Sequence, residues 1–108
     1  MNFNEYQTIA KTTAIYPRTD ALVYPVLGLT GEAGEIANKV KKVIRDNEGV
    51  LSEKSRQSIL DELGDVLWYV SALASDLDVS LEDVAHRNVV KLQKRMDKGT
   101  LGGSGDER

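Results

Sequence analysis

The chain has 108 residues, of which 41% are hydrophobic and only 6% aromatic, and its formal net charge at pH 7 is −3. A chain of this length forms one domain with a limited core, built here from aliphatic side chains. The acidic balance argues against a nucleic acid polymer as partner, because such a partner requires a basic surface. No apolar run approaches the roughly 20 residues that span a bilayer. With no cysteine, and no signal peptide visible at residues 1–5, the expected location is the cytoplasm, without a membrane partner.

Two helices are predicted in the first half of the chain. The first covers residues 3–16 and ends before Pro17, which cannot continue a helix. After a loop, the second begins near Pro25, because proline is tolerated in a first helical turn where its missing N–H is not needed. This helix continues to about residue 47, and Gly49 supplies the stop.

Two further helices are predicted in the second half. Ser52 is the expected N-cap of the third helix, which carries apolar residues out to Leu77. Ser80, with Asp83 three residues later, begins the fourth helix, which ends near Lys98. No segment alternates polar and apolar residues for long enough to indicate a strand.

The predicted fold is therefore an all-α four-helix bundle in a single domain over residues 1–98. The thin core of so short a chain favours assembly as a homo-oligomer. Residues 99–108 are rich in glycine. They are expected to form either a flexible tail or a segment whose backbone N–H groups close over a bound anion.

Four carboxylates occupy matching positions on the two long helices. At about 100° per residue, Glu32 and Glu35 lie at one edge of the apolar stripe of the second helix. Glu62 and Asp65 have the same offsets on the third, so antiparallel packing through the stripes would bring all four into one groove. Two such i, i+3 pairs can hold one metal ion or bridge two, and Mg²⁺ prefers oxygen ligands. The spacing predicts a Mg²⁺ site, with Mn²⁺ as a substitute; the alternative is ordinary surface acids.

Three glycines accompany these acids. Gly31 and Gly34 lie around the first pair, and Gly64 lies inside the second. Glycine costs about 1 kcal/mol relative to alanine in a helix interior, so three glycines beside acids require a reason. The pattern indicates the close approach of a neighbouring helix or of a ligand.

A polar ladder is predicted along the fourth helix. Asn88 falls within its apolar stripe, where a buried amide needs hydrogen-bond partners. Lys91 and Arg95 follow on the same side of the helix. The ladder is suited either to gripping phosphate or to capping and helix-to-helix hydrogen bonds.

Three further side chains lie close to the acidic pairs in the sequence. Lys39, one turn after Glu35, is placed either for contact with a phosphate or for an ion pair with that glutamate. Tyr69, one turn after Asp65, is placed either to stack on a base or to be buried. Trp68 lies off the apolar stripe of its own helix, which favours a subunit contact.

The two acidic motifs resemble those of a known family. Residues 31–35 read Gly-Glu-Ala-Gly-Glu, and residues 62–69 read Glu-Leu-Gly-Asp-Val-Leu-Trp-Tyr. They are similar to the Glu-x-x-Glu and Glu-x-x-Asp motifs of MazG-like nucleotide pyrophosphohydrolases. Residues 88–92, Asn-Val-Val-Lys-Leu, with Arg95 after them, resemble the third segment of that family. The resemblance implies a four-helix fold assembled into homodimers or homotetramers.

The resemblance also implies an activity and a set of site residues. The implied reaction is hydrolysis of a nucleoside triphosphate to a monophosphate and pyrophosphate. Asn88 and Lys91 match residues that help to hold the nucleotide phosphates. The candidate catalytic residues, which match the metal-binding carboxylates of the family, are Glu32, Glu35, Glu62 and Asp65. The competing hypothesis is a non-enzymatic helical oligomer that acts as a binding or scaffold protein.

Overall fold

The computed structural model describes all 108 residues and contains four α-helices and no strand. The all-α class and the number of helices predicted from the sequence are confirmed. None of the helices combines the length and the apolar composition that crossing a bilayer requires. The helices are α1 (Phe3–Lys11), α2 (Val23–Asn47), α3 (Glu53–Asp76) and α4 (Leu81–Asp97), and one 3₁₀ turn, η1, covers Arg18–Asp20.

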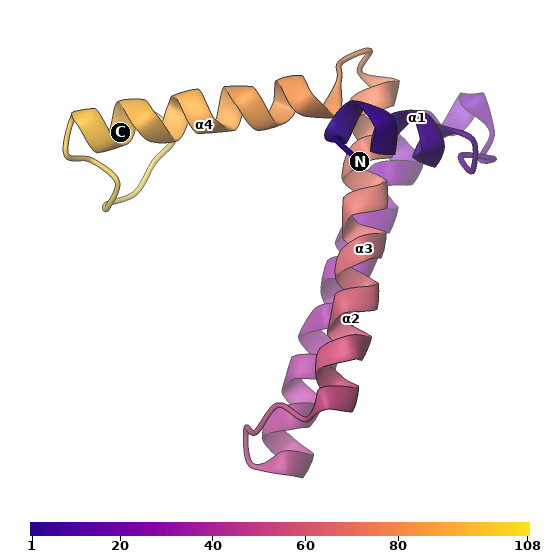
Figure 1. Ribbon diagram of the computed structural model, residues 1–108, viewed down its shortest axis with the longest axis vertical. Coiled ribbons are helices and arrows are strands. Elements are labelled where there is room, and N and C mark those ends of the chain that lie inside the picture. The colour runs from indigo at the N-terminus through magenta and orange to yellow at the C-terminus, as the bar shows by residue number, and fades with distance from the viewer.

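Helices α2 and α3 form a long antiparallel hairpin, which is the most extensive helix packing in the chain (Figure 1). Helix α2 ends where Glu48 and Gly49 adopt left-handed conformations, with φ of 54° and 76°. This reversal stops the helix as predicted for Gly49. Ser52 accepts a hydrogen bond from the backbone N–H of Ser55, so it is the N-cap of α3 that the sequence indicates.

The first helix is shorter than the predicted range 3–16 and ends at Lys11. The hydroxyls of Thr12 and Thr13 donate to backbone carbonyls three residues earlier, at 2.7 and 2.8 Å. Threonine side chains that bond to the nearby backbone compete with continued helix formation. The predicted end at Pro17 was wrong because these threonines end the helix before the proline is reached.

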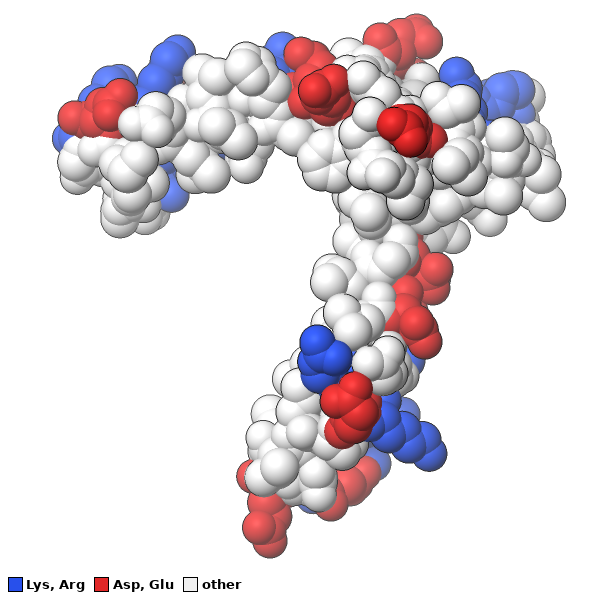
Figure 2. All heavy atoms as spheres, in the orientation of Figure 1, with Lys and Arg blue, Asp and Glu red and all other residues white.

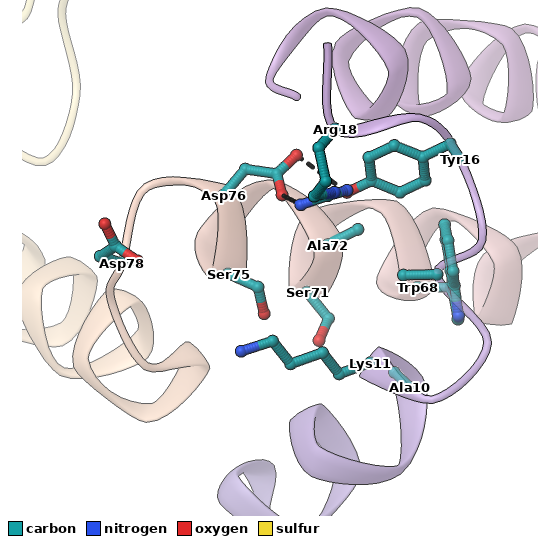
Figure 3. A pocket seen from close by; sticks show the side chains of 11 residues that line it. Ala10, Lys11, Tyr16, Arg18, Trp68, Ser71, Ala72, Ser75, Asp76 and Asp78 are labelled. Atoms are coloured by element: carbon teal, nitrogen blue, oxygen red, sulfur yellow. Dashed lines mark hydrogen bonds and ion pairs between the residues drawn. The ribbon is translucent and has the colours of Figure 1, made fainter. Parts of the chain in front are cut away.

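Asp76, the last residue of α3, anchors the segment that joins α1 to α2 (Figure 3). Its side chain is only 2% exposed, and its carboxylate accepts hydrogen bonds from the Tyr16 hydroxyl at 2.8 Å and from Arg18 Nη1 at 3.0 Å. It also accepts from the backbone N–H of Leu22 at 3.0 Å, which secures that residue at an unfavourable φ of 70°. Although burial opposes ionisation, the three donors hold the pKa of Asp76 below its ordinary value.

Helix α4 projects away from the hairpin (Figure 1). Its start is tied to α1, because the side-chain oxygen of Gln7 accepts a hydrogen bond from the backbone N–H of Leu81 at 2.7 Å. The tail returns to the end of α4, where the Thr100 N–H donates to the Arg95 carbonyl at 2.8 Å. The four predicted helices are present, but one chain does not close them into a compact bundle.

The single chain exposes more surface than a compact protein of its mass. Its accessible surface is 7889 Å² at 11.9 kDa, whereas the scaling for compact monomers gives about 5900 Å². The radius of gyration is 16.8 Å, against about 13 Å for a compact domain of this length. Side chains of the predicted apolar stripes remain exposed, among them Leu63 at 52% and Val89 at 62%. A large apolar surface is therefore exposed on the single chain.

The close approach of α2 and α3 occurs at Gly28. A Cβ atom on Gly28 would overlap the ring of Tyr69, whereas one on Gly31, Gly34 or Gly64 would meet nothing within 4 Å. The expectation that the latter three glycines admit a neighbouring helix was wrong for the single chain. Their open positions leave room for a ligand or for another subunit.

The packing at Gly28 predicts opposite effects for two alanine substitutions in α2. Gly28→Ala is expected to lower the free energy of unfolding by about 1–3 kcal/mol, because the Tyr69 ring has to move. Gly31→Ala, in open space on the same helix, is expected to raise it by up to about 1 kcal/mol. Urea denaturation followed by circular dichroism measures both. Equal stability of Gly28→Ala and the wild type would contradict the packing.

Candidate metal centre

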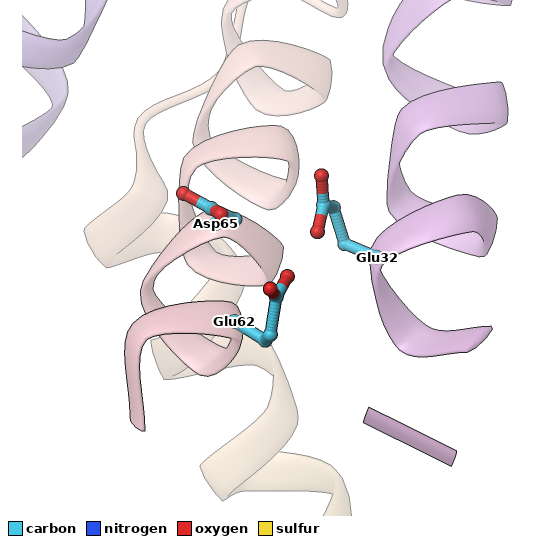
Figure 4. Close-up of side chains that lie close together, drawn as sticks. All are labelled: Glu32, Glu62 and Asp65. Atoms are coloured by element: carbon cyan, nitrogen blue, oxygen red, sulfur yellow. The ribbon is translucent and has the colours of Figure 1, made fainter. Parts of the chain in front are cut away.

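Three carboxylates face one another across the hairpin (Figure 4). Glu32 extends from α2, and Glu62 and Asp65 extend from α3; one oxygen of each lies within 4.8 Å of the others. Glu32 and Glu62 are half-buried, and Asp65 is exposed. Glu35, one turn further along α2, is exposed and lies outside this cluster. The structure thus brings together three of the four predicted carboxylates.

The carboxylates are crowded enough to hold a proton near neutral pH. A hydrogen bond with Glu62 raises the pKa of Glu32 to about 7, with smaller contributions from burial and from the charges of Glu62, Asp65 and Glu35. The same hydrogen bond and the neighbouring Lys39 ammonium lower the pKa of Glu62. Two adjacent carboxylates repel each other when both are ionised, so Glu32 keeps its proton to a higher pH than an isolated glutamate, and a bound cation can take the place of that proton.

Lys39 reaches across the hairpin to α3. Its Nζ lies 3.1 Å from Glu62 Oε1 and also donates to the hydroxyl and carbonyl oxygens of Ser58. The alternative of an ion pair with Glu35 was wrong, because antiparallel packing places Ser58 and Glu62 directly opposite this lysine. Lys39 therefore lies at the end of the cluster nearer the hairpin tip, the turn between Asn47 and Glu53.

Tyr69 belongs to a row of aromatic rings beside the cluster. Its centroid lies 6.3 Å from that of Tyr24, which stacks on Tyr16 at 4.6 Å with an interplanar angle of 13°. Burial raises the pKa of Tyr69, and Tyr24 and the charges of Glu32 and Asp65 add to the rise. The ring thus lies between an aromatic surface and the carboxylates.

Sequence reasoning missed Tyr16 and Tyr24 as members of this row. The available signal was Gly28, a helix-interior glycine one turn after Tyr24 and one turn before Glu32. Trp68, expected at a subunit contact, is half-buried against its own chain. Its Nε1 donates to the Thr13 hydroxyl at 2.8 Å, and its ring meets Tyr69 edge-on at 5.0 Å.

The residues predicted on the fourth helix are not brought to the carboxylates. Asn88 and Lys91 are exposed on the projecting α4, so the predicted burial of Asn88 was wrong: no helix of the chain covers this part of α4 (Figure 1). Arg95 is 7% exposed because the tail covers it, and its Nη2 donates to the Asp106 carbonyl at 3.4 Å.

The donor set fits a hard divalent cation. All three groups offer carboxylate oxygen, without histidine or cysteine, which favours Mg²⁺ or Mn²⁺ over zinc and copper. Because two packed helices already bring the oxygens together, a cation can bind without new secondary structure. Fold and site together define an all-helical protein with an acidic centre suited to a hard divalent cation.

The sequence matches the model of the MazG nucleotide pyrophosphohydrolase domain over residues 25–100, which include all of α3 and α4 and most of α2. The chain belongs to this family. Members generally use a divalent metal, in agreement with the acidic cluster.

Relatives among curated proteins extend the similarity. The chain is 51% identical to the Gene 37 protein of Mycobacterium phage L5 over the full length of both. It is 39% identical to the uncharacterized protein YvdC of Bacillus subtilis strain 168, covering 64% of this chain and 70% of the relative. It is 36% identical to the uncharacterized protein YpjD of the same strain, covering 62% and 60%. No solved structure shows significant similarity.

The raised pKa of Glu32 predicts how the metal-free protein responds to pH. Between the ordinary value of 4.5 and about 7, the folded chain holds a proton that the unfolded chain has lost. Stability from this group is therefore greatest below this window and falls as pH rises through it. Glu32→Gln removes the group, so its melting temperature should fall less than that of the wild type over this window in thermal melts with EDTA.

The same thermal melts with added Mg²⁺ test whether a cation replaces the proton on Glu32. Mg²⁺ should stabilise the wild type more above about pH 7 than below about pH 5, because the cation replaces the shared proton. Glu32→Gln should respond weakly. Asp61→Asn, an exposed neighbour outside the cluster, should behave as the wild type. Parallel pH profiles for wild type and Glu32→Gln would contradict the shared proton.

Proposed function

We propose that the protein is a Mg²⁺-dependent nucleoside triphosphate pyrophosphohydrolase, which cleaves between the α- and β-phosphates and releases a monophosphate and pyrophosphate. One observation carries the proposal: Glu32, Glu62 and Asp65 meet across α2 and α3 in a chain of the MazG family. Glu35 supplies a fourth acid from the next turn of α2.

The carboxylates hold the cation, which neutralises phosphate charge and polarises the phosphoryl group when bound. One of the glutamates orients the attacking water as a base. Catalysis then depends mainly on positioning and charge neutralisation, as in other phosphoryl transfers.

The surroundings of the cluster support one orientation of the nucleotide along the hairpin. Tyr24 and Tyr69 offer aromatic surface to a base on one side of the carboxylates. Lys39 lies on the other side and offers an ammonium to phosphate. A nucleotide with its base at the aromatic row and its phosphates toward Lys39 places its charged linkage over the acids and their cation.

We propose further that the active form is a homodimer or homotetramer. The apolar sides of α2, α3 and α4 that one chain leaves exposed are suited to burial against a second copy. Because α4 projects away from its own hairpin, Asn88 and Lys91 are proposed to reach phosphates bound to another copy. Arg95 extends the same polar ladder beneath the tail.

The reaction is tested by incubating the purified protein and Mg²⁺ with a panel of nucleoside triphosphates. At least one substrate is expected to yield a monophosphate and pyrophosphate, identified by anion-exchange chromatography. Glu62→Gln should reduce kcat by more than about a hundredfold, because a ligand is lost, with helicity unchanged. Asp61→Asn is the control and should keep its activity.

Two outcomes would reject parts of the proposal. Release of a diphosphate and orthophosphate would reject the assigned bond, and full activity of Glu62→Gln would reject the site. No turnover across the panel, together with no stabilisation by Mg²⁺, would favour the non-enzymatic scaffold.

The assembly is tested by light scattering and by mixing variants. A dimer or tetramer is expected at micromolar concentration. Glu62→Gln and Lys91→Met are each expected to be impaired alone, and their mixed oligomers should regain activity by pairing an intact acidic cluster with an intact α4. A monomer, or mixtures no more active than their parts, would contradict the shared site.

A further inference from the structure

A groove lined by lysine and serine side chains lies between α2 and α3 near the tip of the hairpin. Its volume is about 430 Å³. It follows from the antiparallel packing, which sets the last turns of α2 against the first turns of α3. The side chains that give the groove its chemistry are Lys39, Lys42, Lys54, Ser52, Ser55 and Ser58.

Lys39 lines the groove and also contacts the carboxylate cluster. This lysine contacts Glu62 of the cluster at 3.1 Å and lines the groove beside Ser58. Lys42 follows one turn later on α2, about 4.5 Å further along the helix axis. An extended ligand that leaves the carboxylates past Lys39 therefore meets Lys42 next.

The groove carries lysines that form no ion pair within the chain, although the charge of Lys42 contributes to the lowered pKa of Asp46. Asp46, which also lines it, is occupied by Arg45 through contacts of 2.7 and 2.9 Å. Neither Lys42 nor Lys54 has a carboxylate within ion-pairing distance. Figure 2 shows acidic side chains along one edge of the hairpin, and both basic and acidic side chains nearer its tip. Unpaired lysines beside serine hydroxyls are suited to a chain of phosphate groups, with each lysine acting as a point charge.

We propose that this groove binds the oligophosphate chain of the nucleotide, with the β- and γ-phosphates extending from Lys39 to Lys42 and Lys54. The inference rests on the proposed function for the identity of the whole ligand, but the anion site itself does not require hydrolysis. The groove would favour substrates with three or more phosphates over diphosphates. It would also retain pyrophosphate as a product.

The first experiment measures binding of inorganic tripolyphosphate to the full-length protein by calorimetry in EDTA. Lys42→Met is expected to weaken binding by about tenfold, the loss of one charge-assisted contact, and Lys42→Met with Lys54→Met by more. Lys41→Met is the matched control. It removes the same charge from the next residue of α2, where Lys41 is exposed and its Nζ donates to Asn38 at 3.3 Å outside the groove.

The comparison of Lys42→Met with Lys41→Met tests whether the anion binds in the groove. Equal weakening by Lys41→Met and Lys42→Met, or none by either, would overturn the groove, because only general attraction of anions would remain. Orthophosphate that binds as tightly as tripolyphosphate would overturn its assignment to a phosphate chain. Lys41, Lys42 and Lys54 are all exposed, so the variants are expected to fold with unchanged helicity.

A second experiment connects the groove to the reaction. With Mg²⁺, Lys42→Met should lower kcat/KM for a nucleoside triphosphate by about tenfold while changing that for the diphosphate little. Pyrophosphate should also become a weaker product inhibitor. Equal losses on both substrates would overturn the placement of the β- and γ-phosphates. Lysine-dependent tripolyphosphate binding without any hydrolysis would leave the groove standing and reject the proposed function.

Discussion

The register between α2 and α3 is the constraint on which the rest of the molecule depends. It is set at one end of the hairpin by Tyr69, whose ring occupies the space that Gly28 leaves on α2. Further toward the tip, Lys39 crosses to Glu62 and Ser58. These two contacts fix the part of α2 between them, so that Glu32 faces Glu62 and Asp65. A shift of α2 by one turn relative to α3 would separate the carboxylates, and the acidic cluster would no longer form.

The same register places three kinds of side chain in sequence along the hairpin. Aromatic rings come first, then carboxylates, then lysines with serine hydroxyls. A nucleoside triphosphate with a bound divalent cation presents complementary groups in that order: an apolar base, a phosphate–metal centre and an anionic tail. The proposed direction of the nucleotide follows from this correspondence, because reversing the ligand would place its anionic tail against the rings and its base against the lysines.

Some parts of the single chain are held by hydrogen bonds between helices, and others are exposed to solvent. The junction of α1, α3 and the start of α4 is well tied, with Asp76 accepting three hydrogen bonds and Gln7 holding the first turn of α4. Most of α4 and the outer sides of the hairpin are uncovered. If a second copy covers them as proposed, then stability and catalysis both depend on protomer concentration.

Much of the fold was determined by the sequence alone, since its causes are local. Ser52 and Ser80 cap α3 and α4 through their own side chains, and an i, i+3 spacing places Glu62 and Asp65 on one side of a helix without outside help. The family follows from the same motifs, because residue types at fixed intervals are visible in one dimension. The end of α1 has a local cause as well, since Thr12 and Thr13 bond to the preceding turn before Pro17 is reached.

Only the tertiary structure decided which of these residues meet. Helical periodicity placed Glu35 beside Glu32, yet the exact rotation of α2 leaves Glu35 outside the cluster. Helical periodicity also placed Lys39 next to Glu35 on α2, yet Lys39 bonds to Glu62 and Ser58 on α3. The direction of α4, which leaves Asn88 exposed, depends on contacts of its first turn with α1, residues more than seventy positions apart. Such contacts arise from three-dimensional packing between distant segments, and no period within a single helix encodes them.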